Sequence, residues 1–311
     1  MKAITRLATE KSIDDKSPQG SVVIPAHNEE QVIGRLLAPL SNAVRHGEFE
    51  VIVACNGCTD RTAEIARSFP GVSVIELKRG SKPAALNAAD SVAQSWPRIY
   101  LDADVNISVR AIRAVLNYLA DDSTPRAARP PFRYDVGGAS ACVRSFYRAR
   151  SRIATTSDRL WGAGVYALNA HARRKFTNFP TVIADDLFVD GQFTPRQKTI
   201  LETDPVIVST PRTIRTLISI LRRTYRGNSE LAASNLLAVS PNPTSGTLAE
   251  LLRNSRRPSE LLDSAVYIAS VIFARREPPR PGSTVRHGFA VLREIGVPLG
   301  IPSVTGIGYT P

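Results

Sequence analysis

The stretch Ile99-Tyr100-Leu101-Asp102-Ala103-Asp104-Val105 decides how the rest of this sequence is interpreted. An apolar run, typical of a buried strand, ends at two carboxylates separated by one residue. Residues i and i+2 of an extended backbone point to the same side, so we expect Asp102 and Asp104 to converge where the strand ends. Ligands of open α/β sheets bind at that edge. A paired-carboxylate site for a hard divalent cation and a plain solvated turn are the two alternatives.

Composition and charge limit the possible classes of protein. The 311 residues suffice for one large domain, or for one domain with an extension. With 40 Lys and Arg residues against 28 Asp and Glu residues, the net charge is +12, which favours phosphorylated or other polyanionic partners. The Arg residues are dispersed, and the sequence contains neither a zinc finger nor an RNA-binding aromatic motif. We therefore expect no nucleic-acid partner.

The cysteines and the polar amino terminus favour a cytoplasmic protein. Three residues (Cys55, Cys58 and Cys142) make no disulfide framework, and a second pair that would complete a zinc site with Cys55 and Cys58 is missing. The segment after Met1 lacks the pattern of a signal peptide. No run reaches the roughly 20 apolar residues that a membrane-spanning helix needs. Peripheral contact with the anionic inner face of the membrane remains an alternative.

Strands and helices alternate through the first 120 residues. Apolar runs predict strands at 21–25, 49–54, 72–77 and 99–101, with helices between them. This alternation implies an α/β fold with a mostly parallel central sheet and right-handed crossovers. We predict that Asn28 caps the first helix and that Thr59 or Asp60 caps the second.

The regular alternation fades beyond residue 120. We expect a loop from 121 to 133, strands within 198–210, a basic amphipathic helix over 212–226, a linker over 241–246 and helices over 247–256 and 258–276. Asp185 and Asp186 begin an apolar, helical stretch. For the helix at 258–276, packing on the domain is the main expectation, and a dimer face or a membrane surface are the alternatives.

Every predicted βα turn carries polar or small residues where its strand ends. These turns are Pro25 to Glu30, Asn56 to Asp60, Gly80 to Asn87, and Asp102 with Asp104. Side by side they would form one crevice into which helix N-termini open, and Lys82 would add a positive charge for phosphate. Although any one polar turn is unremarkable in a loop, four in succession predict a nucleoside-diphosphate site with a metal.

These segments resemble the family 2 glycosyltransferases of the GT-A fold. The family's Val-Ile-Pro-x-x-Asn-Glu-Glu start matches Val23 to Glu30, and its Asp/Asn-Gly-Ser-Thr-Asp-x-Thr turn matches Asn56 to Thr62 with Cys58 in place of Ser. Its Gly-Lys-x-x-Ala-Leu-Asn segment matches Gly80 to Asn87 with Ser81 inserted. The resemblance covers about residues 19 to 235.

Two acidic motifs complete the resemblance. Asp102 and Asp104 match the metal-binding Asp-x-Asp, and Asp185-Asp186 matches an acidic pair that is more often Glu-Asp. The resemblance implies that Asp104, with Asp102, binds Mn²⁺ or Mg²⁺, and that Asp102 contacts the sugar-nucleotide or a metal-bound water. It also implies that Asp186, with Asp185 as second choice, deprotonates the acceptor hydroxyl for an inverting displacement. Adjacent acids at a helix start are alternatively plain dipole-favouring caps.

Further residues receive donor-binding roles from the same resemblance. Pro25, Ala26 and Glu29 would line the nucleoside, Asn56 stands where the family often has an Asp near the base, and Lys82 would reach the diphosphate or ribose. The glycine-containing segment Trp161 to Tyr166 would lie near the sugar and the acceptor, or would alternatively be plain core.

Arg223 and Arg226 match an Arg-x-x-Arg-Trp element of processive synthases, in which Gly227 here replaces Trp. The two arginines would cover the diphosphate, and a solvated basic helix face is the alternative. The replacement of Trp argues against a processive enzyme.

The combined prediction is a single GT-A domain with a mostly parallel mixed sheet flanked by helices and a short helical C-terminal extension. We expect a loose tail over 1–18, a nucleotide-binding half over 19–120, an acceptor half over 121–240 and the extension over 241–311. The activity would move a sugar from a nucleotide-sugar to a glycan, lipid-linked or small-molecule acceptor, in cell-envelope glycan or glycolipid synthesis. A sugar-phosphate nucleotidyltransferase and a non-catalytic nucleotide-sugar-binding protein are the alternatives.

Overall fold

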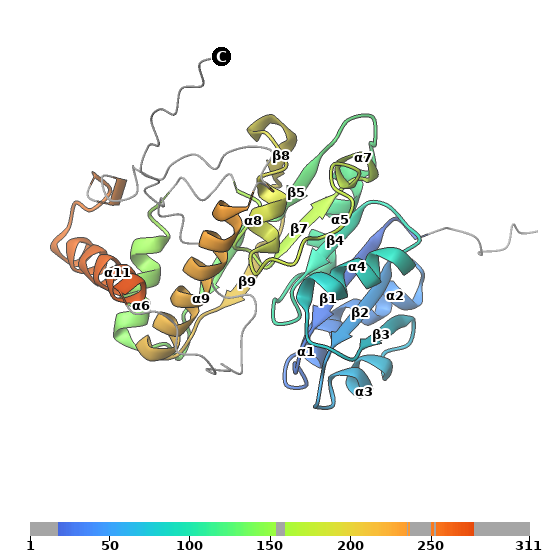
Figure 1. Ribbon diagram of the computed structural model, residues 1–311, viewed down its shortest axis with the longest axis horizontal. Helices are drawn as coiled ribbons and strands as arrows, with labels where there is room; N and C mark the ends of the chain where they lie inside the picture. The colour runs from blue at the N-terminus through green and yellow to red at the C-terminus, as the bar shows by residue number, and fades with distance from the viewer. Residues whose placement is uncertain (1–17, 154–158, 235, 237–249, 252, 277–311) are drawn as a thin grey trace, which may run out of the picture.

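Seven strands form the central sheet in the order β3-β2-β1-β4-β7-β5-β8, and two more form a separate pair, β6-β9 (Figure 1). The computed structural model describes residues 18–153, 159–234, 236, 250–251 and 253–276. The strands are β1 (Ser21–Ala26), β2 (Glu50–Asn56), β3 (Val72–Leu77), β4 (Arg98–Leu101), β5 (Ala127–Arg129), β6 (Phe132–Asp135), β7 (Val165–Leu168), β8 (Lys198–Ile200) and β9 (Val206–Ser209). The predicted α/β fold with a mostly parallel mixed sheet is confirmed.

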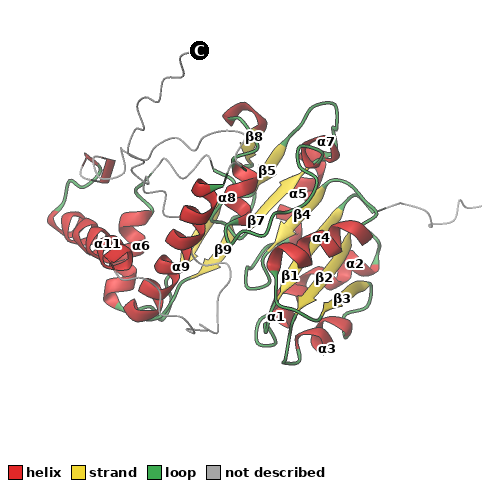
Figure 2. Ribbon diagram, in the orientation of Figure 1, coloured by secondary structure: helices red, strands yellow, loops and turns green. Residues whose placement is uncertain are grey.

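Helices cover both faces of this sheet (Figure 2). They are α1 (Ile33–Leu37), α2 (Ser41–Arg45), α3 (Thr62–Arg67), α4 (Lys82–Val92), α5 (Val109–Leu119), α6 (Ala141–Arg150), α7 (Ala170–Arg173), α8 (Asp185–Asp190), α9 (Ile214–Ala233) and α11 (Pro258–Arg276). Of these described helices, none has the length and apolar character needed to cross a bilayer.

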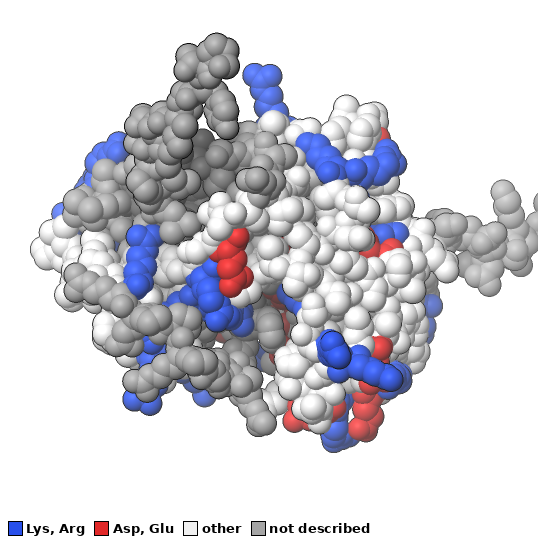
Figure 3. All heavy atoms as spheres, viewed as in Figure 1, with Lys and Arg blue, Asp and Glu red and all other residues white. Residues whose placement is uncertain are grey.

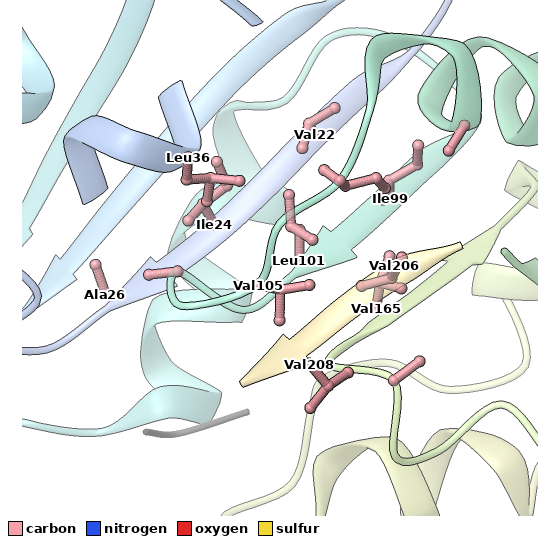
Figure 4. Packing of buried hydrophobic residues seen from close by; sticks show 14 of the residues in the cluster. Val22, Ile24, Ala26, Leu36, Ile99, Leu101, Val105, Val165, Val206 and Val208 are labelled. Carbon is pink, nitrogen blue, oxygen red and sulfur yellow. The ribbon is translucent and has the colours of Figure 1, made fainter. Parts of the chain in front are cut away.

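Side chains along each strand point alternately to the two faces of the sheet, and the core therefore forms two clusters, one on each face. Val22 and Ile24 of β1 pack with Leu36 of α1 and with the apolar face of α5 (Figure 4). Val23, between them in sequence, packs on the opposite face with Leu86 of α4. Because successive side chains of a strand point to opposite faces, a fully apolar strand serves both clusters, which is why β1 contains no charged residue.

The chain reverses direction across the sheet between β1 and β4. It proceeds outward from β1 to β2 and β3, all parallel, and then returns to place β4 parallel to the other side of β1. Such a reversal of strand order is the topological switch point at which doubly wound sheets bind ligands. The carboxyl ends of β1 and β4, with Pro25, Ala26 and Asp102, lie at this point.

The second half of the chain continues the sheet with antiparallel strands. Strand β7 pairs antiparallel with β4 and with β5, and β8 joins β5 in parallel. An isolated bridge between Asn106 and Ile207 ties the segment after β4 to β9. Figures 1 and 2 show α8 and α9 beside β7 and β9, on the other side of the switch point from α4.

Several local predictions were wrong. Asn28 does not cap the first helix: it adopts a φ of 56° in a turn, and α1 begins only at Ile33. Helix α3 has Arg61 at its N-cap, in place of Thr59 or Asp60. The segment 121–133, predicted as a loop, contains β5 and the start of β6.

The two central carboxylates are also held differently from the prediction. Asp102 and Asp104 do not continue the extended strand, because a turn closed by the Val105 N–H and the Asp102 carbonyl, 3.3 Å apart, begins at once. The predicted tail, except for residue 18, and the predicted linker at 241–246 lie outside the described residues. The division into two halves and an extension stays a prediction.

Candidate active site

The turns after β1 and β2 are locked together by hydrogen bonds. The Asn56 side-chain amide donates to the Ala26 carbonyl at 2.8 Å, and the Thr59 N–H donates to Asn28 Oδ1 at the same distance. The Glu29 N–H donates to Thr62 Oγ1 at 2.8 Å, which satisfies a backbone donor in this buried position. Ala26, Glu29 and Asn56, which we predicted to contact the nucleoside, therefore lie in turns that hydrogen bonds join to one another.

The turn after β3 joins this layer through two glycines. Gly57 has a φ of +65°, and a Cβ added there would lie 2.5 Å from the Gly80 backbone nitrogen. Only glycine allows both this conformation and this close approach. The three turns before α1, α3 and α4 are thus neighbours in space, as the alternating pattern predicts.

Lys82 links the two halves of the sheet electrostatically. It begins α4, whose N-cap Ser81 accepts a hydrogen bond from the Ala84 N–H. Its ammonium group lies 2.5 Å from Asp102 Oδ1 and 3.2 Å from Asp185 Oδ1. With side-chain exposures of 13%, 5% and 1%, the three groups form a largely desolvated cluster in which Lys82 compensates two carboxylates.

A pocket opens around this cluster. Its walls come from the end of β1, the first turns of α4, the ends of β4 and β7, and the start of α8. The lining residues are Pro25, Lys82, Leu86, Tyr100, Leu101, Asp102, Gly164, Val165, Tyr166, Asp185 and Asp186. The Asp102 N–H donates to the Gly164 carbonyl at 2.8 Å, so the glycine segment before β7 is held against the Asp-Ala-Asp turn. Lys82, Asp102 and the acidic pair thus share one pocket, although 103 residues separate Lys82 from Asp185 in sequence.

The two aspartates of the acidic pair have different hydrogen-bond and ion-pair partners. Asp185 accepts from the Tyr166 hydroxyl at 3.1 Å in addition to its contact with Lys82. Asp186 accepts from the Gly162 N–H at 3.2 Å and from the Leu187 N–H at 2.8 Å. Both carboxylates are buried, and the two backbone N–H donors fix the orientation of Asp186.

Three carboxylates gather at the switch point itself. Burial, and then the charges of Asp104 and Asp102, raise the pKa of Glu29 to about 8. Asp104 is buried and is not among the residues that line the pocket. Hard oxygen donors of this kind suit Mn²⁺ or Mg²⁺. Among the described residues, no group of three or more His, Cys, Asp or Glu side chains is arranged to hold a metal ion alone.

The arginines of α9 differ in position. Arg226 is exposed and lies 3.7 Å from Glu230 of the same helix, a geometry of a solvated helix face. The helix nevertheless approaches the acidic pair closely: a Cβ on Gly227 would lie 2.9 Å from Ile183 Cβ and 3.5 Å from the Ala184 nitrogen. Arg223 precedes Gly227 by one helical turn and therefore lies on that side of α9. Figure 3 shows basic atoms over α9 beside a hollow in the middle of this face.

Some pocket residues were missed by the sequence reasoning. Tyr166 was included only as the end of a glycine-containing segment, yet its hydroxyl contacts Asp185. Tyr100 stacks on Tyr166 with ring centroids 5.1 Å apart, and its hydroxyl donates to Asp90. Both tyrosines lie on strands that pair directly. The sequence did contain one indication of their role: each tyrosine places a hydroxyl group between apolar neighbours in its strand.

A family model matches the first part of the chain. Residues 21–137 match the family model described as Glycosyl transferase family 2. The match includes the turns after β1 to β4 and ends before the acidic pair. No curated protein sequence matches this chain.

Solved structures share the fold across the larger part of the chain. A mannosyltransferase from Pyrobaculum calidifontis, in complex with GDP-Man and Mn²⁺, is 18% identical, with a TM-score of 0.55 over 86% of this chain and 77% of that chain. Glucosyl-3-phosphoglycerate synthase from Mycobacterium tuberculosis, in complex with Mn²⁺, UDP and glucosyl-3-phosphoglycerate, is 17% identical, with a TM-score of 0.50 over 71% and 81% of the two chains. At these identities the likeness concerns the fold.

Proposed function

We propose that this chain, whose residues 21–137 match the family model Glycosyl transferase family 2, is a glycosyltransferase that uses a nucleotide-sugar donor and inverts the anomeric carbon. The observation that carries the proposal is the pocket at the switch point. It combines Lys82 and Asp102 from the nucleotide-binding side with two buried carboxylates, Asp185 and Asp186, from the other side. A base and a leaving-group site must face each other across the sugar in a direct displacement.

The donor side of the pocket would hold the nucleoside diphosphate. Pro25, Ala26, Glu29 and Asn56 would contact the nucleoside, where four successive turns present backbone and small polar groups. Lys82, at the N-terminus of α4, would exchange part of its contact with the carboxylates for a diphosphate oxygen. Arg223 and Arg226 of α9 could also contact the diphosphate. Arg223 is the stronger candidate, because it lies on the side of α9 that faces the acidic pair. Arg226, paired with Glu230, is the weaker candidate.

A divalent cation fits the donor set of this site. Asp104 and Asp102 would supply hard oxygen ligands, and diphosphate oxygens would add further ones. When bound, the ion would neutralise charge that develops on the departing diphosphate. The complexes of the two structural neighbours with Mn²⁺ support this assignment.

The acceptor hydroxyl would lose its proton to the acidic pair. Asp185 is engaged by Lys82 and Tyr166, whereas the partners of Asp186 given above are backbone N–H groups that fix its orientation. Asp186 is therefore our first candidate for the base and Asp185 the second. The acceptor would be a glycan, a lipid-linked sugar or a phosphorylated small molecule, and the site of action cytoplasmic, at or near the inner face of the membrane.

A donor and metal panel tests the proposal. Hydrolysis and transfer would be measured with UDP- and GDP-sugars in the presence of Mn²⁺ or Mg²⁺. The Asp186→Asn variant should keep its thermal shift with nucleoside diphosphate and metal and lose transfer by roughly 100-fold or more. The matched variant Asp122→Asn, on an exposed loop, should retain both. Full turnover in Asp186→Asn would show that the base is misassigned, and binding without turnover in the wild type would favour a non-catalytic binding protein.

A further inference from the structure

Helix α11 is arranged with its polar residues inside. Asp263, Ser264 and Ser270 are 3%, 2% and 6% exposed, and they face the domain together with Tyr267. Asp263 receives two hydrogen bonds from Arg148 of α6, at 2.7 and 2.9 Å. The Tyr267 ring stacks on Phe146 of α6, with centroids 4.8 Å apart. The inner face is therefore fixed by specific contacts, and the helix cannot rotate to bury a different side.

The outer face of α11 is apolar throughout. Leu261, Leu262, Ile272 and Phe273 are 49%, 63%, 42% and 54% exposed. Ala265 and Ala269 lie exposed between them at helical spacing. Among the described residues, eight large hydrophobic side chains are exposed, and four of them are on this one face. Twelve residues of helix separate its ends, about 18 Å. A continuous apolar stripe of this kind marks an interaction surface.

Arginines lie at the amino-terminal end of this stripe. Arg253, Arg256 and Arg257 are exposed immediately before the helix. Arg275, in the last turn, places its guanidinium over the Tyr225 ring of α9, 4.8 Å from the ring centroid. Neither carboxylate of α11 belongs to the face. Asp263 is buried, and Glu260 accepts hydrogen bonds from the backbone N–H groups of Arg256 and Arg257, at 2.7 and 2.9 Å. Figures 1 and 2 place α11 at the outer edge of the molecule, beside α6.

We propose that the outer face of α11 docks on an anionic lipid surface. The apolar side chains would enter the boundary between headgroups and acyl chains, and Arg253, Arg256 and Arg257 would contact lipid phosphates. A second copy of this chain fits less well, because the pairing of two identical faces brings no carboxylate of α11 to these arginines. The net charge of +12 adds a long-range attraction of the same sign.

Vesicle flotation of the full chain tests the proposal without any donor or acceptor. Binding to vesicles of phosphatidylglycerol and phosphatidylcholine should exceed binding to phosphatidylcholine alone by roughly tenfold or more, and should weaken in high salt. The double variant Leu262→Glu/Phe273→Glu should lose roughly tenfold or more of this binding. Arg256→Gln/Arg257→Gln should reduce the preference for anionic vesicles while leaving the weak binding to neutral ones.

A matched control carries the same charge change elsewhere. Val92→Glu/Ile214→Glu alters two hydrophobic residues of similar exposure, 49% and 39%, on α4 and α9, and should bind vesicles nearly as the wild type does. Thermal unfolding of each variant checks the fold. Equal loss in both double variants, or indifference of the wild type to anionic lipid, overturns the proposal. So does a wild-type dimer that Leu262→Glu/Phe273→Glu converts to monomer without any vesicle binding by either form.

Discussion

Lys82 is the residue on which the charge balance of the pocket depends. Removing its ammonium group leaves Asp102 and Asp185 buried as like charges with reduced compensation. Lys82→Met should therefore lower the free energy of unfolding by about 3–5 kcal/mol, measured by urea denaturation. The double variant Lys82→Met/Asp102→Asn should recover a large part of that loss. Additive losses in the double variant would mean that the two groups do not interact.

Cys58 should be an unusually reactive thiol. A hydrogen bond from the Cys55 thiol, the largest effect, lowers the pKa of Cys58 to about 6, and the Asn28 N–H contributes in the same direction. The thiolate therefore predominates above that pH. In a Cys142→Ser background only Cys55 and Cys58 remain. There, alkylation of Cys58 should level off above about pH 7, and Cys55→Ser should move the levelling to higher pH. A rate that still rises tenfold per pH unit at pH 8 contradicts this assignment.

At the scale of elements, the approach of α9 to the acidic pair depends on Gly227. A methyl group there meets Ile183 at 2.9 Å and forces the helix away from the start of α8. Gly227→Ala should cost about 1–3 kcal/mol in the free energy of unfolding, despite the higher helix propensity of alanine. Gly34→Ala in α1, where the nearest side-chain atom is 3.5 Å away, serves as the control and should be neutral or stabilising. Equal effects of the two changes would argue against tight packing at Gly227.

The sequence was sufficient for elements whose stability is local. Strands β1 to β4 and their helices follow local apolar patterns, so these elements, and the sheet edge at which their turns meet, were predictable. Strands β5 and β6 were not: they have three and four residues, flank Pro130 and Pro131, and exist because β7, β8 and β9 pair with them. Pairing with distant strands leaves no local pattern. The turn at Asn28 could not be predicted for the same reason, because it is held by a hydrogen bond from the N–H of Thr59, 31 residues later.

The candidate site was likewise only partly predictable from the sequence. Asp102, Lys82 and the acidic pair were found from motifs. Their ion pairs, and the place of Tyr166 beside Asp185, required the three-dimensional arrangement, because they join β4, α4, β7 and α8. The turn that begins at Asp102 could not follow from residue spacing, which assumed a continuing strand.

At the scale of the whole molecule, the account requires that the carboxyl edge of the sheet binds a nucleoside diphosphate together with a divalent cation. The amino edge provides an internal reference. Asp121 follows α5 there, and its backbone carbonyl accepts a hydrogen bond from Asn169 at the end of β7. Asp121→Asn therefore makes the same chemical change as Asp104→Asn at the opposite edge.

Calorimetric titration of UDP and GDP into these variants, with and without Mn²⁺, tests that requirement most directly. We expect the wild type and Asp121→Asn to bind one of the two nucleotides only when Mn²⁺ is present. Asp104→Asn should lose roughly tenfold or more of that affinity while remaining folded. Mn²⁺-independent binding in the wild type, or unchanged Mn²⁺-dependent binding in Asp104→Asn, would contradict the account.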